Sequence, residues 1–145
     1  MGSIVITGGG TGGHLKVAKA FIDEFNKEEF TKPFFIGSTN GQDRAWFEDY
    51  AKIKKAYFLD TKGVVNKGFI GKIKSLYNIL KATNHCLGLF DELDVKTVVS
   101  VGGFSAAPAT FAAILKPGCK LYIHEQNSVM GKLNSITSKF AINYT

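Results

Sequence analysis

Short apolar runs alternate with longer helix-compatible segments along the whole chain, and no other feature of the sequence restricts the fold as strongly. Apolar residues stand at consecutive positions in Val98-Val99 and in Leu121-Tyr122-Ile123. This pattern is typical of strands that are buried on both faces of a sheet. Strands that alternate with helices are typical of a parallel sheet covered by helices on both sides. We therefore expect an α/β fold, a Rossmann-like doubly wound parallel sheet.

The same alternation predicts where the elements lie. Strands are expected at residues 3–7, 33–37, 55–60, 97–101, 120–124 and 140–144. Helices are expected at residues 14–27, 42–53, 69–93, 106–115 and 131–139. A loop containing Gly, Asn and Lys is expected at 61–68, where it would carry function or mobility. Because the last predicted strand ends the sequence, we expect residues 1–145 to be one domain of a longer protein.

The composition is that of a folded globular protein, with 45% hydrophobic and 21% charged residues. No apolar segment approaches the roughly 20 residues needed to cross a bilayer, and no signal sequence begins the chain, so we expect a cytosolic location. Cys86 and Cys119 are too few for a disulfide framework or a zinc site and are expected to pack as small apolar side chains.

The charge balance restricts the partners. Eighteen basic and twelve acidic residues give a formal net charge of +6, which favours phosphate-bearing ligands or an anionic membrane surface. Arg44 is the only arginine, whereas proteins that read DNA sequence rely on the guanidinium fork. We expect no nucleic-acid partner.

The first predicted strand leads directly into a glycine loop, Gly-Gly-Gly-Thr-Gly-Gly-His at residues 8–14, and then into a helix. Backbone amides and the positive end of a helix dipole bind phosphate at such a junction. A P-loop is excluded because His14-Leu15 follows the last glycine in place of Lys-Ser or Lys-Thr. An NAD site is disfavoured because residues 37–40, Gly-Ser-Thr-Asn, lack the acidic residue that holds the ribose. A plain tight turn is the remaining alternative.

His14 is the candidate proton acceptor of this loop. It lies in the first turn of the predicted helix, where the dipole disfavours the imidazolium and leaves a ring that can accept a proton. The position alone is equally compatible with a histidine that caps the helix or packs on the loop.

Two further loops follow predicted strands. Residues 101–108 form a second glycine loop, Val-Gly-Gly-Phe-Ser-Ala-Ala-Pro, and residues 124–127 form a third, polar loop, His-Glu-Gln-Asn. Since the carboxyl ends of parallel strands meet at one edge, we expect all three loops to open onto one rim. Glu125 could instead pair with a lysine or cap a helix, and His124 is better explained as a core histidine than as a catalyst. His14, His85 and His124 have no metal-ligand spacing, so no metal site built by the protein is expected.

These three ordered motifs resemble those of the MurG family of peptidoglycan N-acetylglucosaminyltransferases, over essentially the whole chain but only the N-terminal half of the family's proteins. The resemblance implies a GT-B architecture of two Rossmann-like domains, in which this chain is the acceptor side and the C-terminal donor domain is absent. The implied partners are UDP-N-acetylglucosamine (UDP-GlcNAc), lipid I, which is the undecaprenyl-diphosphate-linked muramoyl-pentapeptide, and an anionic membrane surface. The implied location is the cytoplasmic face of the bacterial inner membrane, as a peripheral protein, and no cofactor is implied.

The resemblance also implies roles for individual residues. His14 would be the base for the muramoyl 4-hydroxyl, which attacks the anomeric carbon with inversion while UDP leaves. The residues expected to bind substrate are Thr11, Gly12, Gly13, Gly102, Gly103, Glu125, Asn127 and Asn134. Ala106 stands where the family commonly has serine, so backbone amides rather than that hydroxyl would bind phosphate in the second glycine loop.

The predicted helix at 69–93 has two apolar stripes about 100° apart. One stripe, flanked by basic residues that include Lys72, consists of Phe69, Ile73, Leu76, Tyr77 and Leu80. The other consists of Ile79, Ala82, Cys86, Phe90 and Leu93. We expect the second stripe to cover the sheet and the first to contact an anionic membrane, and the alternative is one broad core face on a bent helix. Two other functions remain open: the nucleotide-binding domain of an NAD(P)-dependent oxidoreductase and a non-catalytic membrane-docking module.

Overall fold

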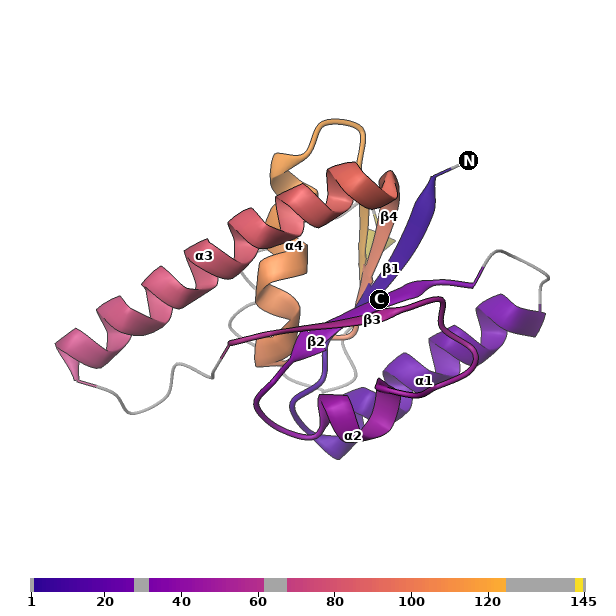
Figure 1. Ribbon diagram of the computed structural model, residues 1–145, viewed down its shortest axis with the longest axis horizontal. Coiled ribbons are helices and arrows are strands. Elements are labelled where there is room, and N and C mark those ends of the chain that lie inside the picture. The colour runs from indigo at the N-terminus through magenta and orange to yellow at the C-terminus, as the bar shows by residue number, and fades with distance from the viewer. Residues whose placement is uncertain (1, 28–31, 62–67, 125–142, 145) are drawn as a thin grey trace.

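A computed structural model describes residues 2–27, 32–61, 68–124 and 143–144 (Figure 1). Its strands run parallel in one sheet in the order β3-β2-β1-β4-β5-β6. The described strands are β1 (Ser3–Thr7), β2 (Phe34–Ser38), β3 (Ala56–Leu59), β4 (Val95–Ser100), β5 (Lys120–Ile123) and β6 (Asn143–Tyr144). The described helices are α1 (Gly12–Lys27), α2 (Asp43–Phe47), α3 (Phe69–Leu93), the 3-10 helix η1 (Phe104–Ala106) and α4 (Ala107–Leu115). The predicted doubly wound parallel sheet is therefore confirmed.

Helices cover both faces of the sheet, α1 and α2 on one and α3 and α4 on the other (Figure 1). Successive residues of a strand point to opposite faces, so Val5 packs in the core under α3 and α4 while Ile6 packs in the core under α1 and α2. Every residue of β2 is buried, because this strand lies inside the sheet and both of its faces are covered.

Most predicted boundaries agree with the structure to within two residues, and one helix differs clearly. The helix expected at 42–53 ends at Phe47. Beyond it the backbone closes two tight turns, with Tyr50 N–H donating to Phe47 O and Ile53 N–H donating to Tyr50 O. Lys54 N–H then bonds to Pro33 O, so the chain has already turned to run beside β2. The helical periodicity of 42–53 was therefore overridden by long-range contacts.

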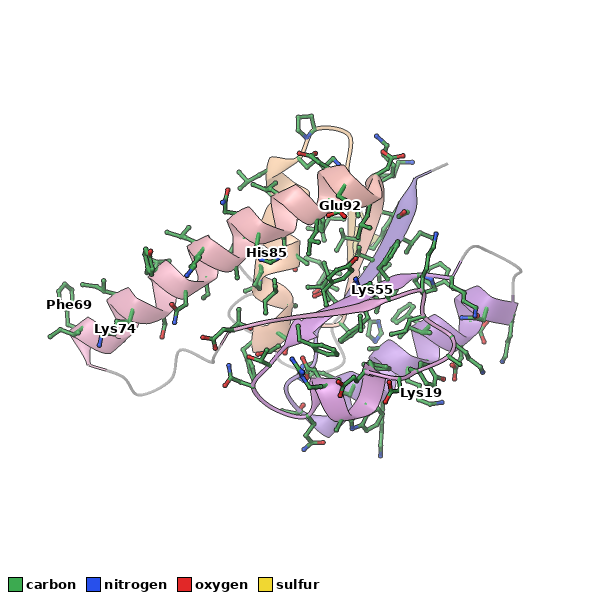
Figure 2. The ribbon with its side chains drawn as sticks, viewed as in Figure 1. Lys19, Lys55, Phe69, Lys74, His85 and Glu92 are labelled. Atoms are coloured by element: carbon green, nitrogen blue, oxygen red, sulfur yellow. The ribbon has the colours of Figure 1, made fainter. Side chains whose placement is uncertain are left out.

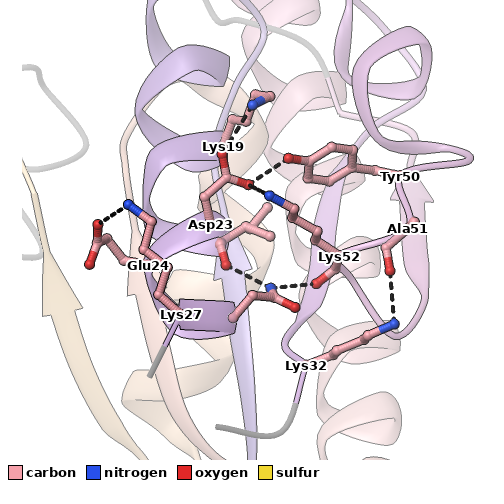
Figure 3. A network of polar contacts seen from close by, with 10 residues as sticks. Lys19, Asp23, Glu24, Lys27, Lys32, Tyr50, Ala51 and Lys52 are labelled. Carbon is pink, nitrogen blue, oxygen red and sulfur yellow. Dashed lines mark hydrogen bonds and ion pairs between the residues drawn. The ribbon is translucent and has the colours of Figure 1, made fainter. Parts of the chain in front are cut away.

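A polar network fixes this turn segment to α1 (Figure 3). The Tyr50 hydroxyl donates to Asp23 Oδ1, and Lys19 Nζ donates to Asp23 Oδ2 at 3.0 Å. Lys52 Nζ lies 3.6 Å from the same carboxylate. Burial alone would raise the pKa of Asp23, but the hydrogen bonds from Tyr50 and Lys19 and the charges of the two lysines lower it below its ordinary value. The same surroundings, burial first and then the bond to Asp23, raise the pKa of Tyr50.

Helix α3 projects beyond the edge of the sheet at its N-terminal end (Figure 1). Its C-terminal half packs on the core through Ala82, Cys86 and Phe90. The helix ends at Leu93, where Asp94 takes a left-handed conformation with φ 54°. Asp tolerates this conformation better than most residues, since its short polar side chain can bond locally. Cys86 is buried, and burial raises the pKa of its thiol to about 12.

Some of the predicted features fall partly or wholly outside the described residues. The helix expected at 131–139 lies outside them, as do residues 62–67 of the predicted irregular loop. Of the strand expected at 140–144, Asn143–Tyr144 is described and pairs parallel with β5.

Candidate functional site

The two glycine loops lie in direct backbone contact at the carboxyl edge of the sheet. They follow β1 and β4, which pair with each other in parallel. The pairing continues past both strands, because Val101 N–H donates to Thr7 O at 2.9 Å and Gly9 N–H donates to Gly102 O at 3.1 Å. β1 is also where the strand order reverses, and open α/β sheets bind ligands at such a switch point.

Glycine is required where the two loops meet. Gly103 has φ +84°, and a Cβ built on it would lie 2.1 Å from Gly9 O. Gly8 has φ +124°, and its Cβ would lie 2.5 Å from Gly102 O. Both the left-handed backbone and the lack of space exclude larger residues. These glycines therefore serve the packing of one loop on the other.

The ring of Phe104, in η1, packs against Gly10 of the first glycine loop. A Cβ on Gly10 would lie 2.4 Å from Phe104 Cε1. Gly41, between β2 and α2, packs against the same place, since its Cβ would lie 3.0 Å from Gly10 O. Two segments that are far from Gly10 in the sequence thus pack against it.

Asp43, the first residue of α2, holds the first glycine loop by a hydrogen bond to its backbone. Its side chain is fully buried, and its two oxygens accept hydrogen bonds from backbone amides, Oδ1 from Gly10 at 2.7 Å and Oδ2 from Ser38 at 2.8 Å. A Cβ on Gly9 would lie 2.6 Å from Oδ1, and one on Gly37 would lie 2.7 Å from Oδ2. Sequence reasoning did not identify Asp43. The only sequence signal was an acidic residue soon after β2, which does not distinguish Asp43 from an ordinary acid in the first turn of a helix.

Helix α1 starts two residues earlier than predicted, so Gly12 and Gly13 lie in its first turn. The helical hydrogen bonds begin with Leu15 N–H donating to Thr11 O at 3.1 Å. The amides of Gly12, Gly13 and His14 precede that bond and point out of the helix end, as the first amides of any helix do. Together with the helix dipole they form a site suited to an anion such as a phosphate group.

His14 and Thr11 are hydrogen-bonded at this helix end. The distance between Thr11 Oγ1 and His14 Nδ1 is 2.8 Å. Thr11 is exposed and His14 is partly exposed, so the pair lies at the surface of the helix end rather than in the core. The structure thus places the candidate base beside the candidate phosphate site.

The second glycine loop uses part of its backbone internally. Gly102 N–H donates to Ser100 Oγ at 3.3 Å, and Ala106 N–H donates to Gly103 O at 3.2 Å. These two amides are therefore engaged within the loop, and the first turn of α1 offers the better anion donors. Ser105 carries a hydroxyl one residue before Ala106, and its Oγ is buried without a hydrogen-bond partner among the described residues.

The remaining histidines lie elsewhere. His124 is partly buried directly after β5 and packs edge-on against Phe21 with ring centroids 5.5 Å apart. His85 is exposed on α3. Within the described ranges no three His, Cys, Asp or Glu side chains gather where they could hold a metal ion. Glu125, Asn127 and Asn134 lie outside the described residues.

A second candidate surface is the projecting end of α3, where Phe69 and Lys74 lie far from the sheet (Figure 2). Phe69 is 79% exposed and Ile70 is 71% exposed. The α3 apolar patch, whose members are all more than half exposed, consists of Phe69, Ile70, Ile73, Leu76, Tyr77 and Leu80. The predicted exposed stripe is therefore confirmed, with Ile70 as an addition. Of the predicted buried stripe, Ala82, Cys86 and Phe90 are buried, whereas Ile79 and Leu93 are partly buried. No helix among the described residues is long and apolar enough to span a membrane.

The fold and the rim together define a class: a Rossmann-like domain whose glycine loops and helix N-terminus are arranged for phosphate binding. Residues 4–145 match the model of the glycosyltransferase family 28 N-terminal domain, and the chain belongs to this family.

Comparison with individual known proteins shows which members of the family this chain is similar to. A Campylobacter hominis protein named UDP-N-acetylglucosamine--N-acetylmuramyl-(pentapeptide) pyrophosphoryl-undecaprenol N-acetylglucosamine transferase is 50% identical over 139 residues, 96% of this chain and 40% of that protein. A protein of the same name from a Nitratiruptor species is 51% identical over 138 residues, 95% of this chain and 41% of that protein. The crystal structure of Acinetobacter baumannii MurG matches with a TM-score of 0.83 and 30% identity, covering 99% of this chain and 41% of that one. The resemblance to MurG is confirmed, and the chain spans about two-fifths of the length of these relatives.

Proposed function

We propose that this chain is the acceptor-side, N-terminal domain of an inverting glycosyltransferase of peptidoglycan synthesis. The enzyme would transfer N-acetylglucosamine from UDP-GlcNAc to the 4-hydroxyl of the muramoyl-pentapeptide of lipid I, giving lipid II. The observation that carries the proposal is the position of His14, which is hydrogen-bonded to Thr11 in the first turn of α1, at the switch point of the sheet. The names of the relatives support the substrates.

The chemistry needs a base and an anion site, and this rim offers both. The acceptor hydroxyl oxygen attacks the anomeric carbon. The O–H bond of the acceptor breaks in this step, and its proton passes to His14. UDP leaves with the electron pair of the broken glycosidic bond. Both substrates carry a diphosphate, for which the amides of Gly12, Gly13 and His14 are suited. Thr11, Gly102 and Gly103 complete the rim on this chain.

The donor would bind mainly to the C-terminal domain of a GT-B enzyme, which is not part of this chain. Catalysis requires donor and acceptor to be held together in one cleft, because most of the rate advantage of such a site comes from positioning. We therefore expect the isolated chain to fold but not to transfer sugar.

The α3 apolar patch suits the lipid-linked acceptor. Large apolar side chains beside Lys72, Lys74 and Lys81 match the interface of an anionic bilayer, where the rings and alkyl chains enter and the lysines stay at the head groups. We propose a peripheral location on the cytoplasmic face of the bacterial inner membrane, with no cofactor and no nucleic-acid partner.

Two other functions are weaker. A dinucleotide-binding domain holds the ribose with an acidic residue after its second strand. The acidic residue that follows β2 here, Asp43, uses both oxygens on backbone amides. A membrane-docking module without catalysis would account for α3 but gives no reason for two interlocked glycine loops beside a histidine.

Calorimetry on this chain distinguishes the three functions. The probes are UDP-GlcNAc, NAD and a soluble lipid I analogue, and binding of the lipid I analogue is the expected result. Binding of NAD in its place would overturn the proposal. The full-length protein should then form lipid II from UDP-GlcNAc and the same analogue, whereas the isolated chain should not.

A further inference from the structure

Thr11 occupies the position that normally caps a helix. It directly precedes α1, and a threonine there usually accepts a hydrogen bond from the backbone amide of the second or third helical residue. In this structure the Thr11 hydroxyl is bonded to the side chain of the third helical residue, at 2.8 Å from His14 Nδ1. The side chain that would ordinarily satisfy a first-turn amide is thus turned to the imidazole.

The direction of this hydrogen bond determines what His14 can do. A neutral imidazole has one N–H and one nitrogen lone pair. If Nδ1–H donates to Thr11 Oγ1, the lone pair is on Nε2 and can take a proton from a substrate. If the hydroxyl donates to Nδ1 instead, Nε2 carries the hydrogen and the ring has no lone pair left for a substrate.

We propose that Thr11 is a positioning residue for His14: its oxygen accepts Nδ1–H and so holds the ring in the tautomer with Nε2 as the acceptor. This inference rests on the proposed function, in which His14 takes the proton of the acceptor hydroxyl. Thr11 then acts through His14.

Proton transfer itself favours this direction. When the acceptor O–H bond breaks and its proton moves to Nε2, the ring becomes an imidazolium with two N–H donors. The bond from Nδ1–H to Oγ1 is already in place and becomes stronger, because a charged donor bonds more strongly than a neutral one. The opposite direction would require the hydroxyl to rotate during the reaction.

A change at Thr11 alters none of the charged side chains of α1 and α2. Lys16 lies two residues further along α1, and Asp43 lies beneath the first glycine loop with both oxygens bonded to amides. Arg44 follows Asp43 on α2. Substitutions at position 11 that keep its volume therefore leave these charges in place.

The tautomer can be measured without any activity. In the full-length protein labelled with ¹⁵N-histidine, nitrogen chemical shifts distinguish Nδ1–H from Nε2–H, and the spectrum of His14→Gln identifies the His14 signals. We expect Nδ1–H in the wild type, Nδ1–H in Thr11→Ser, and a shift toward Nε2–H in Thr11→Val, which keeps the shape but removes the hydroxyl. A wild-type ring with Nε2–H would overturn the proposal.

Kinetics give a second readout. Thr11→Val should lower kcat by roughly three- to tenfold, the size of one net hydrogen bond, with little change in KM for either substrate. Thr11→Ser should restore most of this loss. The acidic limb of the kcat profile should move to lower pH in Thr11→Val, since the imidazolium loses an acceptor, and a move to higher pH would show that the hydroxyl donates.

The outcomes also separate this inference from the proposed function. A raised KM for UDP-GlcNAc in Thr11→Val with an unchanged tautomer would make Thr11 a substrate contact and overturn the positioning role. If the wild-type protein transfers no sugar, the proposed function fails, while the spectra still decide the tautomer.

Discussion

The buried carboxylate of Asp43 accepts a hydrogen bond from the Gly10 amide at 2.7 Å. Its other oxygen accepts from the Ser38 amide at 2.8 Å. One side chain thereby ties the first glycine loop to the end of β2. This connection explains how a loop of such flexible residues can hold a fixed shape before a ligand binds, since each unrestrained glycine costs backbone entropy.

Asp43→Ala is expected to destabilise the chain by about 2 to 4 kcal/mol, because it leaves two backbone amides without their acceptor. Asp43→Asn should cost less, since its amide oxygen keeps one of the two bonds. Urea denaturation measures both. Asp49→Ala, at an exposed acid two residues beyond α2, is the control and should change stability by no more than about 0.5 kcal/mol. Equal effects at positions 43 and 49 would contradict the role of Asp43.

Two glycine-to-alanine substitutions should have opposite signs. Gly103→Ala is expected to destabilise by about 3 kcal/mol or more, since φ is +84° and the new methyl would meet Gly9 O. Gly88→Ala, in α3 with no atom within 4 Å of its Cβ position, should stabilise by about 0.5 to 1 kcal/mol. Urea midpoints of the two variants provide the measurement. A tolerated Gly103→Ala would show that the loops are not packed as described.

The Asp23 network predicts a pH dependence of stability. The folded-state pKa of Asp23 lies below its ordinary value of 3.8, so the ionised carboxylate stabilises the fold above that value, and the contribution is lost as the pH falls through the lower, folded-state pKa. The difference in urea midpoint between the wild type and Asp23→Asn should therefore be largest near about pH 7 and shrink below about pH 4. Glu24→Gln, at an exposed neighbouring acid, is the control and should show little change. A difference that stays constant with pH would contradict the network.

In the full-length enzyme, His14→Ala should lower kcat by about 10² to 10⁴ while changing the apparent affinity for either substrate far less. The reason is that His14, in the proposed role of general base, would act in the transition state. His14→Gln is the sharper variant, because it can still form a hydrogen bond at the helix start but cannot take the proton. Steady-state kinetics with UDP-GlcNAc and a lipid I analogue measure both. Near-normal turnover in His14→Gln would make His14 a positioning residue.

The α3 apolar patch predicts binding to anionic vesicles. Phe69→Asp combined with Ile73→Asp should weaken it, because each large apolar side chain contributes about 1.5 to 3 kcal/mol on burial and each carboxylate is repelled. Sedimentation with phosphatidylglycerol vesicles measures binding, and neutral vesicles provide the comparison.

The control adds the same two charges further along the same helix, as Asn84→Asp with Gly88→Asp, at exposed positions beyond the patch. It should bind nearly as the wild type does. Both substituted residues are exposed, so circular dichroism of the Phe69 and Ile73 variant should be unchanged. Loss of helix signal in that variant, with vesicle binding retained, would assign the patch to the core.

The sequence by itself determined the parallel sheet, both glycine loops and the two stripes of α3. Each of these follows from a local sequence pattern: consecutive apolar residues predict the strands, glycine runs directly after strands predict the loops, and apolar residues three and four positions apart predict the helix stripes. A strand pair such as β1 and β4 then brings the two loops together, because parallel strands end at the same edge.

The tertiary structure alone decided the end of α2 and the burial of Asp43. Helical periodicity continues past Phe47, yet the chain turns there because Tyr50 docks on Asp23 of α1 and Lys54 pairs with Pro33. Asp43 has the sequence signature of an ordinary first-turn acid, and only the approach of Gly10 and Ser38 makes it a buried acceptor. Contacts between segments that are distant in sequence, and the rotamers that follow from them, depend on the packing of the whole chain and leave no local pattern to read.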